Sequence, residues 1–336
     1  MNSQPPDDSL HQADKELVRW IRRRIELGDT PASPASIGYR KDLPDDIARV
    51  LRHVDSVVQA ATATRPAACF LGPEHSYSHL AALAYFGEAA GLLPVATIPA
   101  VFEAVIAGDT RFGIVPIENS TDGRVVDTLS QLIEGGTRIV GEVRLPIHHC
   151  LLAKGQRRQI REIQSKRQAL SQCRGYLSRH FPGALSTPVA STAAAAQAAL
   201  ADASVAAVAS RQAGRHLGLR VIAEAIEDNP SNVTRFVVLG GDMSPPSGND
   251  KTSLLFQVPH QPGSLADAML VLKQHGMNVT FIESFPSPGQ PDEYQFFIEM
   301  DGHADAPEIS AAMNALRRVT SRMVHLGSYA RQRETA

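Results

Sequence analysis

The densest run of reactive side chains in this sequence is residues 118–122, Glu-Asn-Ser-Thr-Asp, which directly follow the apolar run 112–117. A carboxylate, an amide and hydroxyls at this spacing offer hydrogen-bond donors and acceptors to a ligand, and they can position a proton for transfer. A turn could use the same residue types for backbone reasons alone. That alternative explains Gly123 well, but it explains Glu118 and Asn119 poorly.

A hydroxyl and a permanent cation are adjacent at Thr234 and Arg235, at the start of the apolar run 236–240. The hydroxyl can give a proton to a leaving group, and the guanidinium can pair with a carboxylate, which suits an anionic substrate. The alternative is a strand edge on which Thr234 serves β-propensity and Arg235 is solvated. Taken alone, the pair slightly favours that alternative.

Two predicted helices begin at sites rich in hydroxyls. Ser76 and Ser78 follow a Gly-Pro turn, and Ser191 and Thr192 precede an alanine-rich stretch. Side-chain oxygens at such positions cap the first backbone N–H groups of a helix, and free N–H groups there can hold an anion. These segments therefore predict either plain helix caps or carboxylate-binding sites.

The sequence supports no cofactor or metal site. His148, His149 and Cys150 are consecutive, but residues alternate across a strand, so only the first and third would face the same way. The patterns GxGxxG after a strand, GxxxxGK[ST], HExxH and GxSxG are absent. Dinucleotide, phosphate-loop, zinc-protease and nucleophile-elbow chemistry therefore have no sequence support. We expect no cofactor and no metal.

The elements that must position these residues alternate between strand and helix. Between residues 67 and 240, short β-rich runs are followed by helical stretches, which predicts an α/β domain with largely parallel sheets. Ligands bind outside the carboxyl ends of strands in such sheets. Residues 243–250 have the composition of a linker, and residues 251–331 follow the ferredoxin-like order βαββαβ.

The first 64 residues are predicted to be a helical extension. A helix is expected over residues 14–27, Pro31 and Pro34 prevent its continuation, and a second helix opens at Leu43. Two short helices bury little surface by themselves. We therefore expect them to pack on a neighbouring part of the chain or on a second subunit.

Composition excludes several classes of function. The 336 residues include 33 Lys and Arg against 35 Asp and Glu, and the net charge of −2 argues against a nucleic acid or an anionic membrane as partner. No run of about 18 apolar residues predicts a membrane-spanning helix. The acidic, polar start lacks the pattern of a secretory signal. Three widely spaced cysteines indicate a reducing, cytoplasmic setting.

Taken together, the polar segments resemble the prephenate dehydratase family. Residues 115–125 match the family pattern VPIENSxxGxV in full, and residues 232–236 match N-x-T-R-F. The pair at 191–192 matches a Ser-Thr pair that precedes a helix in the family. All of these matches occur in the family's order, which makes the resemblance specific.

The segment at 72–82 matches the family pattern GPxGTFS less completely. Its Gly-Pro, its final serine at Ser78 and two following alanines are kept, while Ser76 stands for the threonine and Tyr77 for the phenylalanine. His75 replaces a glycine. We expect this departure to reshape the turn.

The C-terminal unit resembles an ACT regulatory domain. Residues 262–265 resemble the effector-binding Gly-Ala-Leu region, and residues 283–286 stand where the family has Glu-Ser-Arg-Pro, with Phe285 in place of the arginine. Because ACT units usually act in pairs, the resemblance implies a homodimer or a larger homo-oligomer. It implies L-phenylalanine as effector, bound near Gly263, Ser264, Leu265, Glu283 and Ser284.

The resemblance implies three regions in an α/β protein. Residues 66–242 would form a two-lobed catalytic domain similar to periplasmic binding proteins, and residues 251–331 the ACT domain. Residues 1–64 occupy the place of the chorismate mutase domain of bifunctional relatives. Because too little chain precedes Ala67 for a full three-helix mutase, we expect a remnant without mutase activity. A helical arm used only for packing is the compatible alternative.

The implied reaction removes water and carbon dioxide from prephenate and leaves phenylpyruvate. In this interpretation Thr234 donates the proton, Arg235 pairs with a substrate carboxylate, and Glu118 and Asn119 position the hydroxyl or a relay. Glu118 could instead be structural. The other implied substrate-binding residues are Ser76, Ser78, Ser120, Ser191, Thr192 and Phe236.

Two other functions remain open from the sequence. The substrate could be arogenate, which has an amine in place of the keto group. The chain could also be an amino-acid-sensing protein without turnover, which would suit an α/β domain joined to an ACT unit. The departures at His75 and Phe285 favour the sensor, whereas the intact segments 118–123 and 234–236 favour the enzyme.

Overall fold

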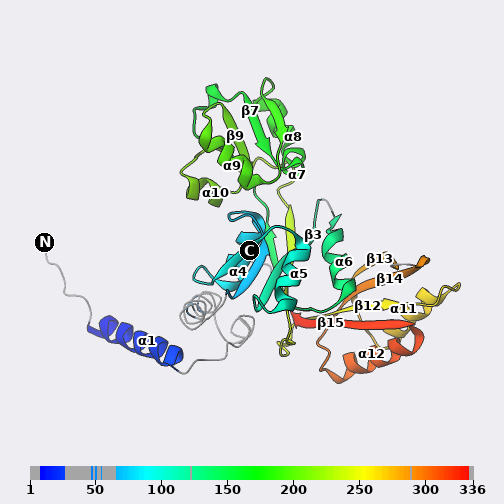
Figure 1. Ribbon diagram of the computed structural model, residues 1–336. Coiled ribbons are helices and arrows are strands. Elements are labelled where there is room, and N and C mark those ends of the chain that lie inside the picture. Colours follow the sequence, from blue (N-terminus) through cyan, green and yellow to red (C-terminus); the bar gives the residue numbers. More distant parts are fainter. Residues whose placement is uncertain are drawn as a thin grey trace.

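The computed structural model describes residues 8–26, 66–121, 123–287 and 290–332, and the single positions 47, 50 and 54. Within these residues the strands form three sheets, and Figure 1 shows an upper lobe, a lower lobe and a C-terminal domain beside the lower lobe. The α/β class is confirmed. The boundaries of the three predicted regions, 1–64, 66–242 and 251–331, stay predictions.

The lower lobe is built around a mixed sheet in the order β2-β1-β3-β11-β5. The strands β1, β2 and β3 are parallel, whereas β11 runs antiparallel to both β3 and β5. The prediction of largely parallel sheets is therefore wrong for the part of this sheet that contains β3, β11 and β5. The strands are β1 (Ala68–Leu71), β2 (Leu92–Val95), β3 (Phe112–Asn119), β5 (Arg138–Pro146) and β11 (Val233–Gly240), with β4 (Gly123–Arg124) paired to β3.

Helices cover both faces of this sheet. The helix α4 (Tyr77–Phe86) packs on the face that carries Phe236, while α5 (Ile98–Ala107) and α6 (Val126–Glu134) pack on the face that carries Val237. Covered strands need apolar residues on both sides, which explains the nearly continuous apolar runs in the sequence. Adjacent residues of β11 consequently belong to different hydrophobic clusters.

The upper lobe is an insertion between β5 and β11. Its sheet has the order β10-β6-β9-β7-β8, and the chain enters it after Pro146 and leaves it before Val233. Figure 1 shows these two crossings as adjacent strands between the lobes. The elements are β6 (Cys150–Ala153), η1 (Arg157–Gln159), β7 (Glu162–Ser165), α7 (Arg167–Gln172), α8 (Arg174–His180), β8 (Leu185–Pro188), α9 (Thr192–Ala201), β9 (Val205–Ala209), α10 (Arg211–Leu217) and β10 (Arg220–Ala223).

The C-terminal domain has the predicted order βαββαβ. Its antiparallel sheet runs β13-β14-β12-β15, with β12 (Asp250–Gln257), β13 (Val279–Ser287), β14 (Gln290–Asp301) and β15 (Arg322–Ala330). Both helices, α11 (Ser264–Gln274) and α12 (Pro307–Val319), contribute to the cluster on one face. The other face packs on the lower lobe, where Leu255, Phe297 and Tyr329 share a cluster with Ile139 and Val237.

The N-terminal helix α1 (Asp8–Glu26) contains the predicted helix 14–27 up to Glu26, but it begins six residues earlier than predicted. Leu17, Val18 and Trp20 are exposed on it, and Figure 1 shows it projecting from the rest of the chain. The second predicted helix, from Leu43, lies outside the described residues apart from three positions. Among the described helices, none has the length and hydropathy to cross a membrane.

Candidate active site

The end of β3 and the start of β11 meet at the junction of the two lobes, where they place Asn119 beside Thr234. The two residues are register partners, and Asn119 Nδ2 donates to Thr234 Oγ1 at 2.7 Å. The same nitrogen donates to Asn232 Oδ1 at 3.0 Å. Because the amide uses a lone pair of the Thr234 hydroxyl, the hydroxyl hydrogen remains available for donation.

A chain of hydrogen bonds continues from this pair into the upper lobe. Asn232 Nδ2 donates to Gln172 Oε1 at 3.2 Å, and His149 Nε2 lies 3.0 Å from the same oxygen. His149 Nδ1 lies 2.9 Å from the hydroxyl of Tyr77, at the start of α4. The chain therefore joins both lobes through side chains that come from four separate segments.

The tautomer of His149 follows from its partners. Burial lowers the pKa of His149, so the ring is neutral, and its Nε2–H donates to Gln172. Nδ1 is then an acceptor for the Tyr77 hydroxyl, which shares its hydrogen with the His148 carbonyl at 2.9 Å, and burial raises the pKa of Tyr77 well above its usual value. This stretch of the site thus consists of neutral hydrogen-bonding groups.

Arg235 points to the opposite face of the sheet from Thr234, because adjacent residues of a strand alternate. Its Nε donates to Glu118 Oε2 at 3.0 Å, and its Nη1 donates to Glu299 Oε1 at 2.6 Å and to Glu142 Oε2 at 3.5 Å. Only 3% of the residue is exposed. The structure therefore separates Arg235 and Glu118 from the Thr234 hydroxyl, and neither contributes to the hydrogen-bond chain between the lobes.

The ion cluster around Arg235 joins the lower lobe to the C-terminal domain. Lys251 Nζ donates to Glu142 Oε2 at 2.9 Å, and the Tyr329 hydroxyl donates to Glu299 Oε1 at 3.1 Å. Burial alone would lower the pKa of Arg235, but the charge of Glu299 outweighs it and raises that pKa. Arg235 is therefore a buried cation at this domain contact, and its Nη2 has no hydrogen-bond partner among the described residues.

A cavity of about 400 Å³ opens on this same face of the sheet. Ser120 lines it, and its hydroxyl donates to the Ser231 carbonyl at 3.3 Å and accepts from the Val233 amide at 2.9 Å. Ser120 thus ties the loop after β3 to the start of β11. The lining residues are Glu118, Ser120, Arg144, Pro146, Ser231, Val233 and Arg235.

The predicted hydroxyls at the two helix starts act as caps. Ser76 Oγ accepts from the His79 amide at 3.3 Å, and Ser191 Oγ accepts from the Ala194 amide at 3.0 Å. Ser78 is buried near the start of α4, and Thr192 is the first residue of α9. Capping leaves the other N–H groups of each first turn available to an anion.

Phe236 lies in the core of the lower lobe. Only 1% of it is exposed, and it packs with Phe70 and Val143 beneath α4. Its side chain therefore offers no surface to a substrate, contrary to the role that the resemblance implies for it. Strand alternation places it below Thr234 on the same face, where the sheet is already covered.

His75 joins the lobes at a second point. Its backbone has a φ of 63°, in the left-handed region, which explains why the resembling pattern has glycine there. Its ring stacks on His216 of α10 with centroids 3.8 Å apart, and its amide donates to His79 Nδ1 at 2.8 Å. The Ser210 hydroxyl of the upper lobe donates to the His75 carbonyl at 3.4 Å.

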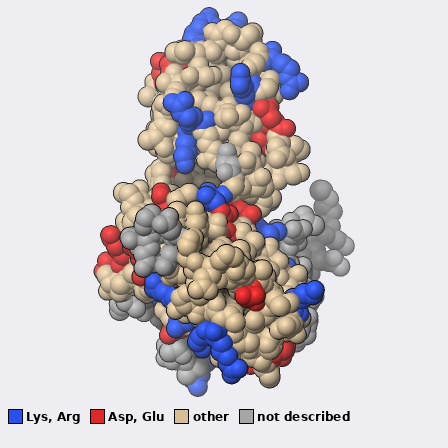
Figure 2. Space-filling view, turned by 90° about the vertical axis from the view of Figure 1, so that its right-hand side faces the viewer, with Lys and Arg blue, Asp and Glu red and all other residues tan. Residues whose placement is uncertain are grey.

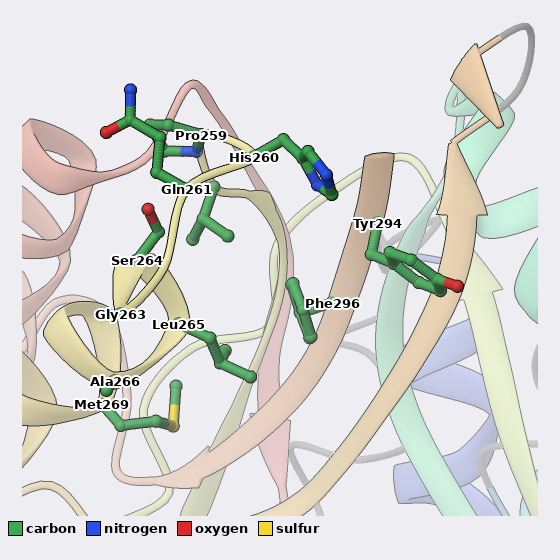
Figure 3. Close-up of a pocket in the computed structure, with 11 residues that line it drawn as sticks. Pro259, His260, Gln261, Gly263, Ser264, Leu265, Ala266, Met269, Tyr294 and Phe296 are labelled. Atoms are coloured by element: carbon green, nitrogen blue, oxygen red, sulfur yellow. The ribbon is translucent and has the colours of Figure 1, made fainter. Parts of the chain in front are cut away.

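The predicted effector residues divide between two faces of the C-terminal sheet. Gly263, Ser264 and Leu265 line a cavity of about 540 Å³ at the start of α11 (Figure 3). Ser284 is the register partner of Phe296, which also lines this cavity, so it lies on the same face. Glu283 lies on the opposite face.

Figure 2 shows how charged side chains are distributed over one face of the molecule. Lys and Arg occur there in separate groups on both lobes, with Asp and Glu side chains between them. A nucleic-acid partner requires a continuous basic patch or stripe. That face does not carry one.

Sequence reasoning missed Gln172 and Asn232, and it considered His149 only as a metal ligand. Asn232 belongs to the matched segment 232–236, which was a usable signal. Gln172 is an isolated polar residue near the end of a helix, and only the packing of the lobes brings it to Asn232. The described residues contain no group of three or more His, Cys, Asp or Glu that could hold a metal.

Comparison with known proteins gives two family matches. The family model "Prephenate dehydratase" matches residues 68–244, and the model "ACT domain" matches residues 252–318. A bifunctional chorismate mutase/prephenate dehydratase of Neisseria gonorrhoeae is 39% identical, covering 97% of this chain and 96% of the relative. The protein of the same description from Stutzerimonas stutzeri is 37% identical, covering 94% of this chain and 84% of the relative.

Two solved structures share the fold over most of the chain. A prephenate dehydratase of Arthrobacter aurescens in complex with L-Phe has a TM-score of 0.73 and 34% identity, covering 79% of this chain and 90% of that chain. A protein described as a novel type of quorum quenching acylase also has a TM-score of 0.73, with 31% identity, covering 79% of this chain and 98% of that chain.

Proposed function

This chain belongs to the prephenate dehydratase family, and we propose that it acts through the Thr234 hydroxyl at the junction of its lobes. It converts prephenate into phenylpyruvate, water and carbon dioxide. The observation that carries the proposed site is the 2.7 Å hydrogen bond from Asn119 to Thr234 at the lobe junction.

The reaction needs one proton from the protein. As the ring C–O bond breaks, the leaving hydroxide takes the proton of Thr234 and departs as water. The electrons of the bond between the ring and its carboxylate form the new ring double bond, and carbon dioxide leaves. The Thr234 oxygen becomes negative during this transfer and recovers its proton from solvent after product release.

Asn119 lowers the cost of that transfer. Its Nδ2 already donates to the Thr234 oxygen, so the amide dipole is aimed at the atom on which charge develops. Asn232 and Gln172 hold Asn119 in this orientation through the hydrogen-bond chain. Substrate carboxylates would be held by the free N–H groups at the starts of α4 and α9, because Arg235 lies on the other face.

Replacement of the proton donor tests this assignment. Thr234→Ala should lower kcat by about 10²–10⁴-fold, while Thr234→Ser should recover most of the activity because it keeps the hydroxyl. Phenylpyruvate absorbance gives the rate. Thr187→Ala, in β8 of the upper lobe, is the matched control and should leave turnover unchanged. Near-normal turnover of Thr234→Ala would refute the role of the threonine.

The same assay separates the alternative functions. Prephenate and arogenate offered in parallel rank the two substrates by kcat/KM, and turnover of neither would indicate a sensor. Chorismate tests residues 1–64, for which we propose no mutase activity. We also propose a cytoplasmic location, which the three unpaired, buried cysteines Cys69, Cys150 and Cys173 support.

For regulation, we propose that L-phenylalanine binds in the cavity lined by Gly263, Ser264 and Leu265 and inhibits the enzyme. The volume of about 540 Å³ supports a ligand of this size. The Arthrobacter aurescens relative, whose structure contains L-Phe, also supports it. Calorimetry with L-phenylalanine tests the proposal, and no heat of binding at millimolar concentration would contradict it.

We propose a homodimer formed through the C-terminal domain. The strand β13 is an edge of its sheet, and Ile282 is 47% exposed and Tyr294 48% exposed beside the effector cavity. A second copy would cover these apolar groups. Light scattering of Ile282→Lys against the parent tests this, because a charge there should shift the mass toward the monomer.

A further inference from the structure

Arg124 makes an ion pair with Glu283 between the two domains. The arginine belongs to β4 of the lower lobe, the glutamate belongs to β13 of the C-terminal domain, and the guanidinium carbon lies 5.8 Å from the centre of the Phe285 ring. The side chains of Arg124 and Glu283 are 46% and 22% exposed. A cation of the lower lobe is thus held by a carboxylate and an aromatic face of the regulatory domain.

The position of Arg124 connects it directly to the active site. In the ladder between β3 and β4, Arg124 pairs with Glu118, and the next pair joins Gly123 to Asn119. Asn119 is the residue that donates to the Thr234 hydroxyl. A shift of β4 therefore moves the orienting amide without any intervening loop.

The other end of the contact lies on the strand next to the proposed effector cavity. On β13, Ser284 is opposite Phe296 of β14, which lines the cavity, whereas Glu283 and Phe285 belong to the face that meets the lower lobe. Because neighbouring residues of one strand share a backbone, a ligand that shifts Phe296 and its partner Ser284 also shifts Glu283 and Phe285. The contact with Arg124 then has to change.

A second arginine makes a similar contact but is suited to a different task. Arg235 is held by Glu299 and lies 5.4 Å from the centre of the Phe281 ring, fully enclosed between the domains. Breaking such a buried pair is costly, whereas a partly exposed pair contributes little and is easily exchanged. The Arg235 contact therefore holds the domains together, and the Arg124 contact can switch.

We propose that Arg124 is a positioning residue that transmits occupancy of the C-terminal cavity to Asn119 and Thr234. This inference rests on the proposed inhibition by L-phenylalanine. It also explains how Phe285 can stand where the resembling pattern has arginine. In this protein the cation between the domains is Arg124 of the lower lobe, and Phe285 supplies the ring on which Arg124 packs.

The test compares binding with inhibition in Arg124→Gln. L-Phenylalanine binding, measured by calorimetry, should stay within about threefold of the parent, because the cavity is untouched. Inhibition of phenylpyruvate formation should weaken by at least about fivefold, the lower range of allosteric coupling. A purely structural arginine would alter both or neither, and either result would overturn the inference.

Arg157→Gln is the matched control, because Arg157 also packs on an aromatic ring, that of Phe181 in the upper lobe. It should leave both binding and inhibition unchanged. The exchanged pair Arg124→Glu with Glu283→Arg should restore inhibition to within about threefold of the parent, since it rebuilds the ion pair. Inhibition still lost in the exchanged pair would contradict the role of the contact.

Failure of the inference and failure of the proposed regulation give different results. If the parent binds L-phenylalanine and is inhibited, but Arg124→Gln is inhibited equally, only the inference is wrong. If the parent neither binds nor responds to L-phenylalanine, the proposed regulation is wrong and the inference falls with it.

Discussion

His75 adds a titratable contact between the lobes at a position where the family pattern has glycine. Burial, and then the neighbouring His216, lower the pKa of His75, while Glu74 acts in the opposite direction. The His75 and His216 rings stack with their centroids 3.8 Å apart. The folded protein therefore favours the neutral form of the His75 ring.

The pH dependence of stability follows from this lowered pKa. Between the folded pKa and the ordinary value of 6.5, the unfolded chain binds more protons at His75 than the folded chain. The stability that neutral His75 contributes to the folded protein is therefore fully present above pH 6.5, the ordinary pKa, and it is lost as the pH falls through the lowered pKa of the folded state. His75→Gly should lose less stability than the parent between pH 8 and pH 5 in urea titrations.

His180→Asn, at an exposed histidine near the end of α8, is the control and should follow the parent curve. Parallel curves for His75→Gly and the parent would contradict the assignment, because the stacked pair would then contribute nothing that depends on protonation. Replacement by glycine also suits the left-handed backbone at this position, so the variant should fold.

At the scale of elements, the strand β11 links the proposed site to domain packing, because its two faces carry different residues. Thr234 pairs with Asn119 at the lobe junction, and Arg235 faces β14 of the C-terminal domain, where Glu299 Oε1 accepts a hydrogen bond from it at 2.6 Å. Burial would raise the pKa of Glu299, but the charges of Arg235 and Lys251 outweigh it and lower that pKa. The carboxylate therefore stays ionised in the folded protein.

Removal of this charge should loosen β11. Glu299→Gln removes a carboxylate that pairs with the buried cations Arg235 and Lys251. The free energy of unfolding, measured in urea, should therefore fall by about 3 kcal/mol. Glu308→Gln, exposed in the first turn of α12, is the control. Equal stability of the Glu299 variant and the parent would show that the cluster contributes no net stabilisation.

Elements were more predictable than their orientation. The order βαββαβ and the strand–helix alternation follow from periodicity and turn residues, so the sequence predicts them. It does not predict that β11 returns antiparallel beside β3, because this pairing joins residues more than a hundred positions apart. The role of Arg235 as partner of a substrate carboxylate stays a prediction, but strand alternation directs its side chain away from Thr234 and toward the cavity that Glu118 and Ser120 line.

The site itself was predictable only in part. Asn119 and Thr234 belong to segments that resemble a family pattern, so their pairing could be expected. Gln172, His149 and Glu299 are far from these segments in sequence, and only tertiary packing gives them their partners. Residues of this kind lack a local signal, because nothing in their neighbourhood on the chain specifies the contact.

For the whole molecule, the close approach of β15 to β5 decides whether the regulatory domain stays on the lower lobe. Gly327 has a φ of 149°, and a Cβ built there would overlap the carbonyl oxygen of Ile139. The surrounding cluster contains Tyr329 and Leu326 from the C-terminal domain together with Ile139 from the lower lobe. Even one methyl group at Gly327 must therefore move the two domains apart.

Gly327→Ala should destabilise the domain contact by about 1–3 kcal/mol, which calorimetry would record as a lower melting temperature of the C-terminal domain. Inhibition by L-phenylalanine should weaken in the same variant, since the contacts of Arg124 and Arg235 cross this interface. Gly183→Ala, where a Cβ meets no neighbour, is the control. An unchanged melting curve would show that the backbone at Gly327 adjusts without cost.

The insertion of the upper lobe between β5 and β11 fixes where its motion is centred. Pro146 pairs with Val233, and the Ile147 amide donates to the Asn232 carbonyl at 2.8 Å, so both crossings are fastened next to Thr234. A rotation of the upper lobe would then pivot close to the Thr234 hydroxyl, which would move little while the far end of the lobe moves a long way. Such a rotation would admit and release a bulky ring while the proposed proton donor stays almost stationary.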